Sequence, residues 1–515
     1  MRCCVALVLS LIVTSASVGE SEAARILALF SMNGKSHFVM FEALLKGLAA
    51  RGHQVYVVGH FPQKNPVPNY TDISVEGSLP EIVNNFTVEF ARNLGYIQIF
   101  KFIWNTNLEM CKTVLEHPKV QELILSDGKF DLIITEIFGP DCFLGLSHRF
   151  KAPFISMISS VMMPWGNDRI MNPDHPAYIP NYFVSYSDHM TLGQRIINTV
   201  STVISKVGHY YFAELPMDKI SRRHFGNDVP PLAELKKNTS LILVNSHVSL
   251  NFPRPTVPGF IDVAGLHIHS KGKLPDDLET FIDESKDGVI YFCLGSLVRP
   301  ETLPRDKLEA FISVFSELPQ RVIWKTNNIP GLPKNIRASK WLPQFDILSH
   351  PNVRVFMTHG GLMGTQEAVQ AGVPMVGIPL FADQELNIRN CVSKGTAVMV
   401  LYDDVTKDSI LSALQTVLHD PSYQKNAKEL SRRFRDRPQS PLETAIFWTE
   451  YVIRHRGASH LRSAAVDLTW YQYLLLDVMT VIVMFVVVML ATTYFILKKL
   501  ISICSGSLTK KVKTS

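Results

Sequence analysis

Charge and cysteine are both scarce in this sequence of 515 residues. Only 19% of the residues are charged, the net charge is +5, and the basic residues are scattered, so the composition does not indicate a nucleic-acid partner. Between the two ends of the chain the cysteines are widely spaced, with no metal-ligand spacing and no evident disulfide framework: Cys111, Cys142, Cys293 and Cys391. We therefore expect a core that does not depend on disulfide bonds.

A glycine-rich turn at residues 359–364 (HGGLMG) lacks the spacing of the two common nucleotide motifs. It is not G-x-G-x-x-G, and no Gly-Lys-Ser/Thr follows it. An apolar run at residues 353–358 precedes it, a helix-length segment at residues 362–371 follows, and a second apolar run covers residues 375–380. A turn that opens a helix after a strand presents N–H groups and a helix dipole to phosphate. The alternative is a tight turn without a ligand.

Aromatic, amide and acidic side chains flank this turn. Trp341 and Gln344 precede it, Glu367 lies in the predicted helix, and Asp383 and Gln384 follow the second apolar run. Such a set suits a base to be stacked, ribose hydroxyls to be bonded, phosphates to be cradled and a sugar to be held. The pattern predicts a site for a sugar nucleotide.

The length of the chain and its apolar fraction, 46%, indicate two domains with some membrane segment. Residues 25–31, 38–51 and 54–58 have the patterns of a buried strand, a helix and a second strand, and residues 289–294 begin another such alternation. The predicted fold class is α/β, with two doubly wound Rossmann-like domains that face each other across a cleft.

The two ends of the chain predict entry into the secretory pathway and a membrane anchor. Residues 1–24 have the basic start, apolar stretch and small residues of a secretory signal peptide. Residues 478–497 form an apolar run long enough to cross a bilayer, although a buried soluble helix would have the same pattern. Basic residues follow, which places residues 498–515 in the cytosol and the rest in the lumen. Lys511 and Lys513 resemble a lysine-based endoplasmic-reticulum retrieval signal.

The segment of residues 341–384 resembles the signature of the UDP-glycosyltransferase family (glycosyltransferase family 1), in its glucuronosyltransferase-like branch. Many positions match in type and register, and the similarity extends over nearly the whole chain. The resemblance implies the two-domain architecture called GT-B and the activity of a metal-independent hexosyltransferase. It also implies that an N-terminal domain binds the acceptor and a C-terminal domain binds the UDP-sugar.

A histidine after the first strand is the expected catalytic base. Ser36 would cap the following helix and place His37 in its first turn, where the helix dipole keeps imidazole neutral. A capping pair without chemistry would have the same spacing, but the resemblance implies that His37 is the base. Glu136, at the end of an apolar strand at residues 130–135, would orient His37, with Asp141 as the fallback partner.

The resemblance also assigns the donor site. Trp341 would stack on uracil, Gln344 would bond its edge, Glu367 would bind the ribose, and Asp383 and Gln384 would hold the sugar. The diphosphate would be held by residues of two turns and a helix: Ser296, His359, Gly360, Gly361, Gly364 and Thr365. No D-x-D triplet occurs, which fits a mechanism without a divalent ion. We expect no metal and no cofactor, with UDP-glucose or UDP-glucuronate as co-substrate.

Other positions concern the acceptor and the details of the donor site. Met363 stands where many relatives have a polar residue, and its thioether cannot donate to a phosphate. Arg254, in a Pro-Arg-Pro triplet, would approach donor charge or only stiffen a linker. Aromatic-rich segments at residues 86–110 and 191–212 suit a lipophilic acceptor. Three sequons would be glycosylated in a luminal domain: Asn69, Asn85 and Asn238.

The predicted parts of the chain are the signal peptide (1–24), the acceptor domain (25–252), a linker (253–282), the UDP-sugar domain (283–440), returning helices with a membrane-proximal segment (441–473), a transmembrane helix (474–497) and a cytosolic tail (498–515). We expect a single-pass type I enzyme of the endoplasmic-reticulum membrane that transfers glucuronic acid or glucose, with inversion, to hydroxyl groups of small lipophilic molecules. Homo-oligomers are possible partners. The alternatives are an inactive membrane binding protein and a UDP-sugar epimerase.

Overall fold

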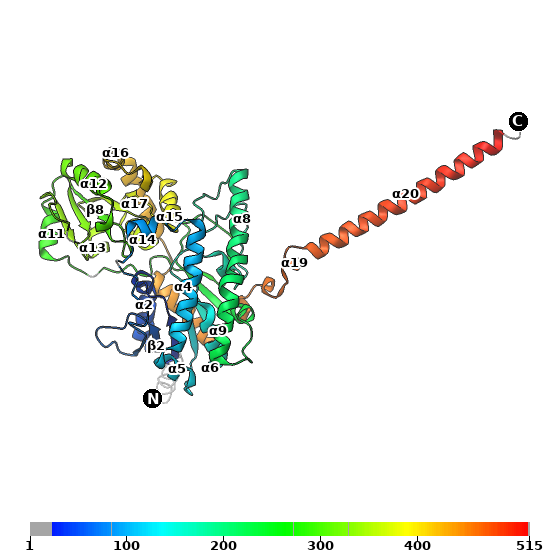
Figure 1. The fold of residues 1–515 in the computed structure, drawn as a ribbon, viewed down its shortest axis with the longest axis horizontal. Helices are drawn as coiled ribbons and strands as arrows, with labels where there is room; N and C mark the ends of the chain where they lie inside the picture. The colour runs from blue at the N-terminus through cyan, green and yellow to red at the C-terminus, as the bar shows by residue number, and fades with distance from the viewer. Residues whose placement is uncertain (1–22, 84, 271, 328, 513–515) are drawn as a thin grey trace, which may run out of the picture. The chain divides into compact units, whose positions relative to one another are not determined.

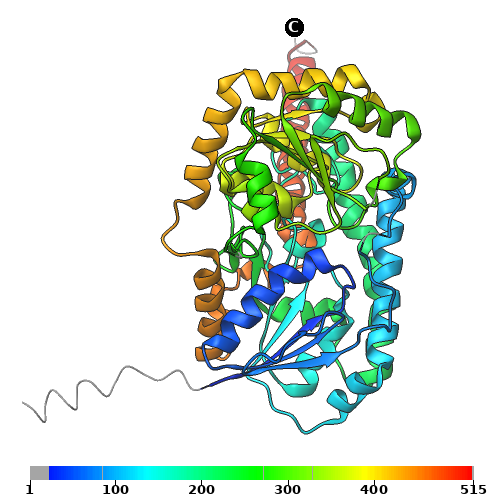
Figure 2. The ribbon, with the colours of Figure 1, turned by 90° about the vertical axis from the view of Figure 1, so that its left-hand side faces the viewer.

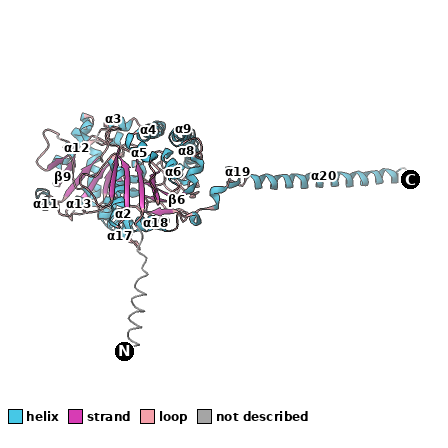
Figure 3. Ribbon diagram, turned by 90° about the horizontal axis from the view of Figure 1, so that it is seen from below, coloured by secondary structure: helices cyan, strands magenta, loops and turns pink. Residues whose placement is uncertain are grey.

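The computed structural model describes residues 23–83, 85–270, 272–327 and 329–512, with side chains up to residue 504. All but the last two residues of the predicted signal peptide therefore lie outside the described residues. The chain divides into a body, up to Arg462, and a C-terminal unit that begins at Ser463. The body contains two parallel β-sheets, each with helices against it (Figure 1; Figure 3, strands in magenta).

The first sheet has seven strands in the order β3-β2-β1-β4-β5-β6-β7. They are β1 (Arg25–Phe30), β2 (Gln54–Gly59), β3 (Tyr70–Ser74), β4 (Leu132–Glu136), β5 (Phe154–Ile158), β6 (Thr239–Val244) and β7 (Phe260–Asp262). β4, β5 and β6 are buried along their whole length because helices cover both faces. The register pairs Leu29 with Thr135 and Glu136 with Met157, so the carboxyl ends of β1, β4 and β5 meet at one edge.

The helices of the first half are α2 (Lys35–Ala50), α3 (Val88–Arg92), α4 (Tyr96–Glu116), α5 (Pro118–Leu125), α6 (Gly145–Phe150), α7 (Pro164–Asn167), α8 (Leu192–His209), α9 (Leu215–Phe225) and α10 (Leu232–Leu235). α2 shares one hydrophobic cluster with the sheet, and α4, α5 and α9 share another. A π-helical segment, η2 (Tyr210–Glu214), joins α8 to α9.

The second sheet has six strands in the order β10-β9-β8-β11-β12-β13. They are β8 (Val289–Cys293), β9 (Arg321–Lys325), β10 (Ile336–Ser339), β11 (Val353–Thr358), β12 (Met375–Gly377) and β13 (Ala397–Met399). The helices of this half are α11 (Asp276–Asp283), α12 (Arg305–Glu317), α13 (Gln344–Leu348), α14 (Leu362–Ala371), α15 (Gln384–Val392), α16 (Lys407–His419) and α17 (Pro421–Arg435). Figure 2 shows this half, in green and yellow, above the first.

Two segments cross between the halves. α18 (Pro441–Arg454) follows the second half but packs with α2, and Glu450 accepts hydrogen bonds from Arg51 at 3.2 Å. In the other direction, Phe86 forms a β-bridge with Val298, and α3 places Val88 in the core of the second half.

A disulfide between Cys111 of α4 and Cys142 corrects the expectation of a core without disulfides. Cys142 lies in the short helix η1 (Asp141–Leu144), directly after the loop that follows β4. The Cα atoms are 6.1 Å apart although 31 positions separate the two residues in the sequence. Such a pair is formed by the packing of a helix on a sheet, and spacing alone does not reveal it.

The C-terminal unit contains α19 (Trp470–Tyr473) and one long helix, α20 (Leu476–Val512). Residues Leu476–Cys504 are long and apolar enough to cross a membrane, and none of the most apolar window is buried. The helix continues past the predicted span through most of the predicted tail, to Val512, whereas Lys513 lies outside the described residues.

Candidate functional site

A cavity of about 650 Å³ lies between the two halves of the body. The first half contributes α2, α4 and the loops after β4 and β5, and the second half contributes α13, α14 and the loops after β8, β11 and β12. This edge holds the carboxyl ends of the strands in both sheets, where ligands of open α/β sheets bind. The size is within the usual range for a small-molecule site.

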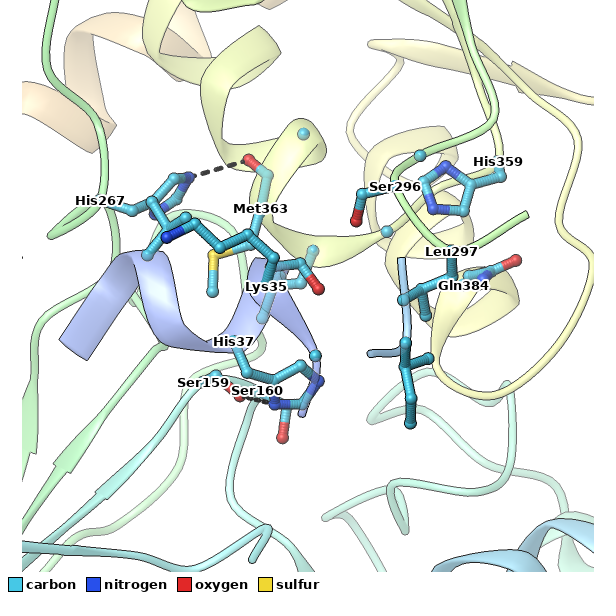
Figure 4. Close-up of a pocket in the computed structure, with 18 of the residues that line it drawn as sticks. Lys35, His37, Ser159, Ser160, His267, Ser296, Leu297, His359, Met363 and Gln384 are labelled. Atoms are coloured by element: carbon cyan, nitrogen blue, oxygen red, sulfur yellow. Dashed lines mark hydrogen bonds between the residues drawn. The ribbon is translucent and has the colours of Figure 1, made fainter. Parts of the chain in front are cut away.

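His37 lies in the first turn of α2 and lines the cavity. Its Nδ1 atom is 2.6 Å from Ser159 Oγ (Figure 4). The same atom is 3.3 Å from Glu136 Oε1. With the proton on Nδ1, the lone pair of the neutral ring is on Nε2, which can accept a proton. The residue that precedes the helix is Gly34, which corrects the expected cap by Ser36.

Glu136 ends β4 and is buried, with 4% of its surface exposed. Its Oε2 atom has no hydrogen-bond partner among the described residues, so Oε1 at His37 is its principal polar contact. Asp141, the fallback partner, is instead bound by the buried guanidinium of Arg169. That ion pair satisfies the Asp141 carboxylate, and the fallback assignment is therefore withdrawn.

Ser159 was not identified from the sequence, although it makes the shorter hydrogen bond to His37. It follows β5, the strand beside β4, so the rule that selected Glu136 from a strand end selects Ser159 as well. Lys325 was also not identified from the sequence. It ends β9 and lines the cavity, so the same strand-end rule selects it.

On the second half, two glycine turns lie against each other. Gly295 has φ +88°, and a Cβ there would come within 2.5 Å of His359 Nε2. Gly360 has φ +86°, and a Cβ there would come within 2.5 Å of Ile388 and 2.8 Å of the Gln384 carbonyl oxygen. Both positions require glycine. Ser296, Gly361 and Gly364 line the cavity, whereas Gly360 and Thr365 do not, and Thr365 is fully buried.

His359 also lines the cavity (Figure 4). Burial and the nearby charge of Lys325 lower the pKa of His359 to about 4, so the ring is neutral at pH 7 and offers an N–H rather than a full charge. Lys325 itself donates to the Gly295 carbonyl at 2.8 Å and lies 4.8 Å from the centre of the Trp341 ring.

The remaining donor residues form two groups. Gln344 donates to Glu367 and accepts from the Tyr291 hydroxyl at 3.1 Å, and both residues line the cavity with Trp341. At the start of α15, the Gln384 side-chain oxygen accepts from the backbone N–H groups of residues 380 and 381.

Asp383 lies beside Gln384, and its Oδ2 atom accepts from Asn387 at 3.0 Å. Burial raises the pKa of Asp383, while the hydrogen bond from Asn387 and the charge of His37 lower it. Asp383 and His37 both line the cavity.

Met363 and Arg254 have different surroundings. The Met363 sulfur accepts from Asn245 at 3.6 Å and its carbonyl from His267 Nε2 at 3.2 Å, so Met363 joins the halves while lining the cavity. Arg254 donates to the Pro173 carbonyl and to Asn167 and does not line the cavity, which favours its structural interpretation.

The part of the cavity next to α4 is apolar and aromatic, with Ile99, Phe102, Ile103, Met110, Phe138 and Phe381 in its wall. Asn107 lies among them, is 2% exposed, and its Nδ2 atom has no partner within the described part of the chain. The three asparagines of the sequons, Asn69, Asn85 and Asn238, are exposed.

Comparison with solved structures identifies the fold. The fold matches UDP-glucose:anthocyanidin 3-O-glucosyltransferase in complex with UDP, at 18% identity, with 84% of this chain and 99% of that chain covered and a TM-score of 0.56. CalG4, the calicheamicin glycosyltransferase, matches with the same TM-score at 17% identity over 84% of this chain and 99% of its own. The predicted fold class, the GT-B fold of glycosyltransferases, is thus confirmed.

The particular family follows from sequence. The model of the UDP-glucoronosyl and UDP-glucosyl transferase family matches residues 26–514. UDP-glucosyltransferase 2 of Dactylopius coccus is 45% identical over 90% of this chain and 91% of its own length. UDP-glucuronosyltransferase 2B19 of Macaca fascicularis is 32% identical, with 90% of each chain covered. The protein belongs to the UDP-glycosyltransferase family and is an enzyme of that class.

Proposed function

We propose that the protein transfers glucose from UDP-glucose to a hydroxyl group of a small lipophilic acceptor. The observation that carries the choice of glucose is the charge around Asp383. None of the described residues that line the cavity is an arginine, and Lys35 and Lys46 are paired with Glu42. The remaining lysine of the lining, Lys325, is bound to the Gly295 carbonyl and lies over Trp341. We therefore place no cation beside the half-buried Asp383 to offset its repulsion of a glucuronate carboxylate. The 45% identical relative is named a glucosyltransferase.

His37 is the proposed general base. It accepts the acceptor's hydroxyl proton on Nε2, while Glu136 and Ser159 at Nδ1 orient the ring and stabilise the imidazolium that forms. The oxygen then attacks the anomeric carbon on the face opposite UDP, the bond to the diphosphate breaks, and the configuration inverts. Asp383 and Gln384 bind hydroxyl groups of the sugar during this step.

The leaving diphosphate gains charge, which the second half is arranged to stabilise. The N-terminus of α14, the neutral N–H of His359 and the Ser296 hydroxyl are the proposed donors, with Lys325 as the nearest cation. Trp341 stacks on uracil and Gln344 bonds its edge, with Glu367 on the ribose. Thr365 is left out of this set because its hydroxyl is buried away from the cavity.

The apolar wall beside α4 supports a lipophilic acceptor. α20 supports a single-pass membrane anchor, and the exposed sequons agree with a luminal body in the endoplasmic reticulum. Residues 25–252 and 283–440 are the proposed acceptor and donor domains, with residues 441–473 returning to the first.

The test is an assay of the full chain in detergent or nanodiscs with UDP-glucose and with UDP-glucuronate, against a panel of phenols and steroids. We expect UDP release with UDP-glucose that depends on the acceptor, and a product of inverted anomeric configuration by NMR. Transfer from UDP-glucuronate alone would overturn the choice of sugar. UDP binding without transfer to any acceptor would favour a binding protein.

A further inference from the structure

A cluster of buried polar side chains lies in the first half of the body, away from the cavity. Asp141 of η1, His209 at the end of α8 and Glu214 at the end of η2 are each at most 5% exposed. One nitrogen or oxygen atom from each residue lies within 4.8 Å of those from the other two. None of the three residues lines the cavity, so the proposed transfer reaction does not use them.

His209 is the unusual member of this cluster. Neither of its ring nitrogens has a hydrogen-bond partner among the described residues, and the same holds for Glu214 Oε1. The ring is held parallel to that of Trp165, with the ring centres 4.4 Å apart. Burial, with the charges of Lys236 and Arg169, lowers the pKa of His209 well below its ordinary value, so the ring is neutral at pH 7. Because buried polar atoms are costly without partners, these atoms favour a ligand that they can share.

The backbone brings His209 and Glu214 to the same side through a π-helical turn. The two residues are five positions apart, and an α-helix would turn them away from each other by about 140°. The π-helical segment η2, at Tyr210–Glu214, winds more slowly and thereby corrects this angle. Such turns are rare and are frequent at functional sites. Asp141 comes to the same place from η1, after the loop that follows β4.

Two cations contact the acids of the cluster. Arg169 donates to Asp141 Oδ1 and Lys236 donates to Glu214 Oε2. The Arg169 side chain is only 1% exposed, whereas that of Lys236 is 18% exposed and can turn to solvent. With Lys236 turned away, two carboxylates and one guanidinium leave one net negative charge in a buried place, which a cation must balance. A metal ion and Lys236 would therefore compete for Glu214.

We propose that Asp141, His209 and Glu214 bind one zinc ion, which replaces Lys236 at Glu214. Imidazole nitrogen and carboxylate oxygen are common zinc ligands, and with three protein ligands a water molecule takes the fourth position. The edge of such a tetrahedral site is about 3.3 Å, so the ligand atoms move closer by up to about 1.5 Å. Arg169 keeps its bond to Asp141 and orients that ligand. The ion ties η2 to η1 and stabilises the first half.

The test uses the purified full chain in detergent, treated with EDTA, dialysed and then titrated with zinc chloride or cobalt chloride. Elemental mass spectrometry gives the metal content after gel filtration, and the visible absorption of bound cobalt reports its coordination number. The variants are His209→Gln and Lys236→Gln. The matched control is His60→Gln, because His60 is also buried, its ring nitrogens also lack partners, and it belongs to no such cluster in the described residues. A cooperative thermal transition verifies that each variant is folded.

We expect one zinc ion per chain in the wild type and in His60→Gln, and none in His209→Gln. Zinc should raise the Tm of the wild type, and bound cobalt should show the intense absorption of four-coordinate sites. Lys236→Gln should bind zinc at least about tenfold more tightly, because the competing cation is gone.

Two results would overturn the proposal. Equal zinc content in the wild type and His209→Gln would place the metal on other side chains. Unchanged zinc affinity in Lys236→Gln, or no zinc bound by that variant, would mean that Lys236 is a permanent partner of Glu214 and that the cluster is a buried ion-pair network. The result for Lys236→Gln does not depend on whether His209→Gln folds.

Discussion

The two walls of the cavity are built in different ways. Most of the donor wall comes from one continuous stretch, residues 341–384. Strand β8 and the loop after it add Tyr291, Cys293, Gly295, Ser296 and Leu297, and β9 adds Lys325. The acceptor wall is made of side chains from separate elements, and 99 and 122 positions separate His37 from Glu136 and Ser159. One stretch thus supplies most of the proposed nucleotide site, whereas the position of the proposed base depends on α2, β4 and the loop after β5.

The largest test of this contrast is His37→Ala. We expect kcat to fall by up to about 10⁴-fold, the upper range for a general base. UDP affinity should be unchanged, because the donor wall is formed by the other half. Steady-state kinetics and calorimetry measure the two effects, and His269→Ala, another histidine of the cavity, is the control. If His37→Ala lowered UDP affinity as well as kcat, the two walls of the cavity would not be independent.

The second test removes the disulfide that joins α4 to the loop after β4. Cys111→Ser should lower the free energy of unfolding by about 2–4 kcal/mol, because the closed loop restricts the unfolded chain. Acceptor KM should rise more than UDP KM, since α4 lines only the acceptor wall. Cys391→Ser, at a buried free cysteine, is the control. Equal changes in the two KM values would contradict the separation.

The third test concerns the donor wall. Gly360→Ala combines positive φ with a clash at Ile388, and it should weaken UDP binding by at least about tenfold, or about 1.4 kcal/mol. Gly331→Ala has the same backbone strain at φ +76°, but nothing lies within 4 Å of the added Cβ. If both variants bind UDP alike, the close approach of the turns is not what forms the site.

The fourth test addresses His267, which joins the walls through Met363. Burial lowers the pKa of His267 to about 4, from 6.5, so protonation favours the unfolded chain. Stability is full above pH 6.5 and falls as the pH drops towards 4. In His267→Gln the free energy of unfolding should fall less steeply with decreasing pH, by about 1.4 kcal/mol per pH unit between pH 6.5 and 4. Urea unfolding at pH 7, 6 and 5 measures it. An unchanged slope would assign the loss to other groups, such as His247, whose pKa is also lowered to about 4 by burial.

The smallest expected effect is that of Asn107→Leu. The amide is the unpartnered polar group in the apolar wall, so acceptors with a second oxygen should lose about 1 kcal/mol of binding, or about fivefold in KM. Simple phenols should be unaffected or improved. Comparing one hydroxylated and one unsubstituted phenol series measures the difference, and a uniform change would indicate a general packing effect.

The sequence predicted what depends on local pattern. The alternation of apolar runs and helices predicts both sheets, and the typed positions of residues 341–384 predict the nucleotide site. Two contacts of the acceptor wall were missed because each joins distant residues: Ser159 to His37 and Cys111 to Cys142. The pairing of Asp141 with Arg169 likewise depends on packing, since both are carried inward by segments that follow different strands.

The β-bridge at Phe86 has a mechanical consequence. Phe86 donates to the Leu297 carbonyl at 3.0 Å and accepts from the Arg299 N–H at 2.9 Å, directly beside Ser296 in the donor turn. If the two halves moved far apart, these two hydrogen bonds beside the proposed nucleotide site would have to break first. We therefore expect products to leave through small sliding movements of the two halves. Weakening the β-bridge at Phe86 would speed product release and reduce the discrimination between donors.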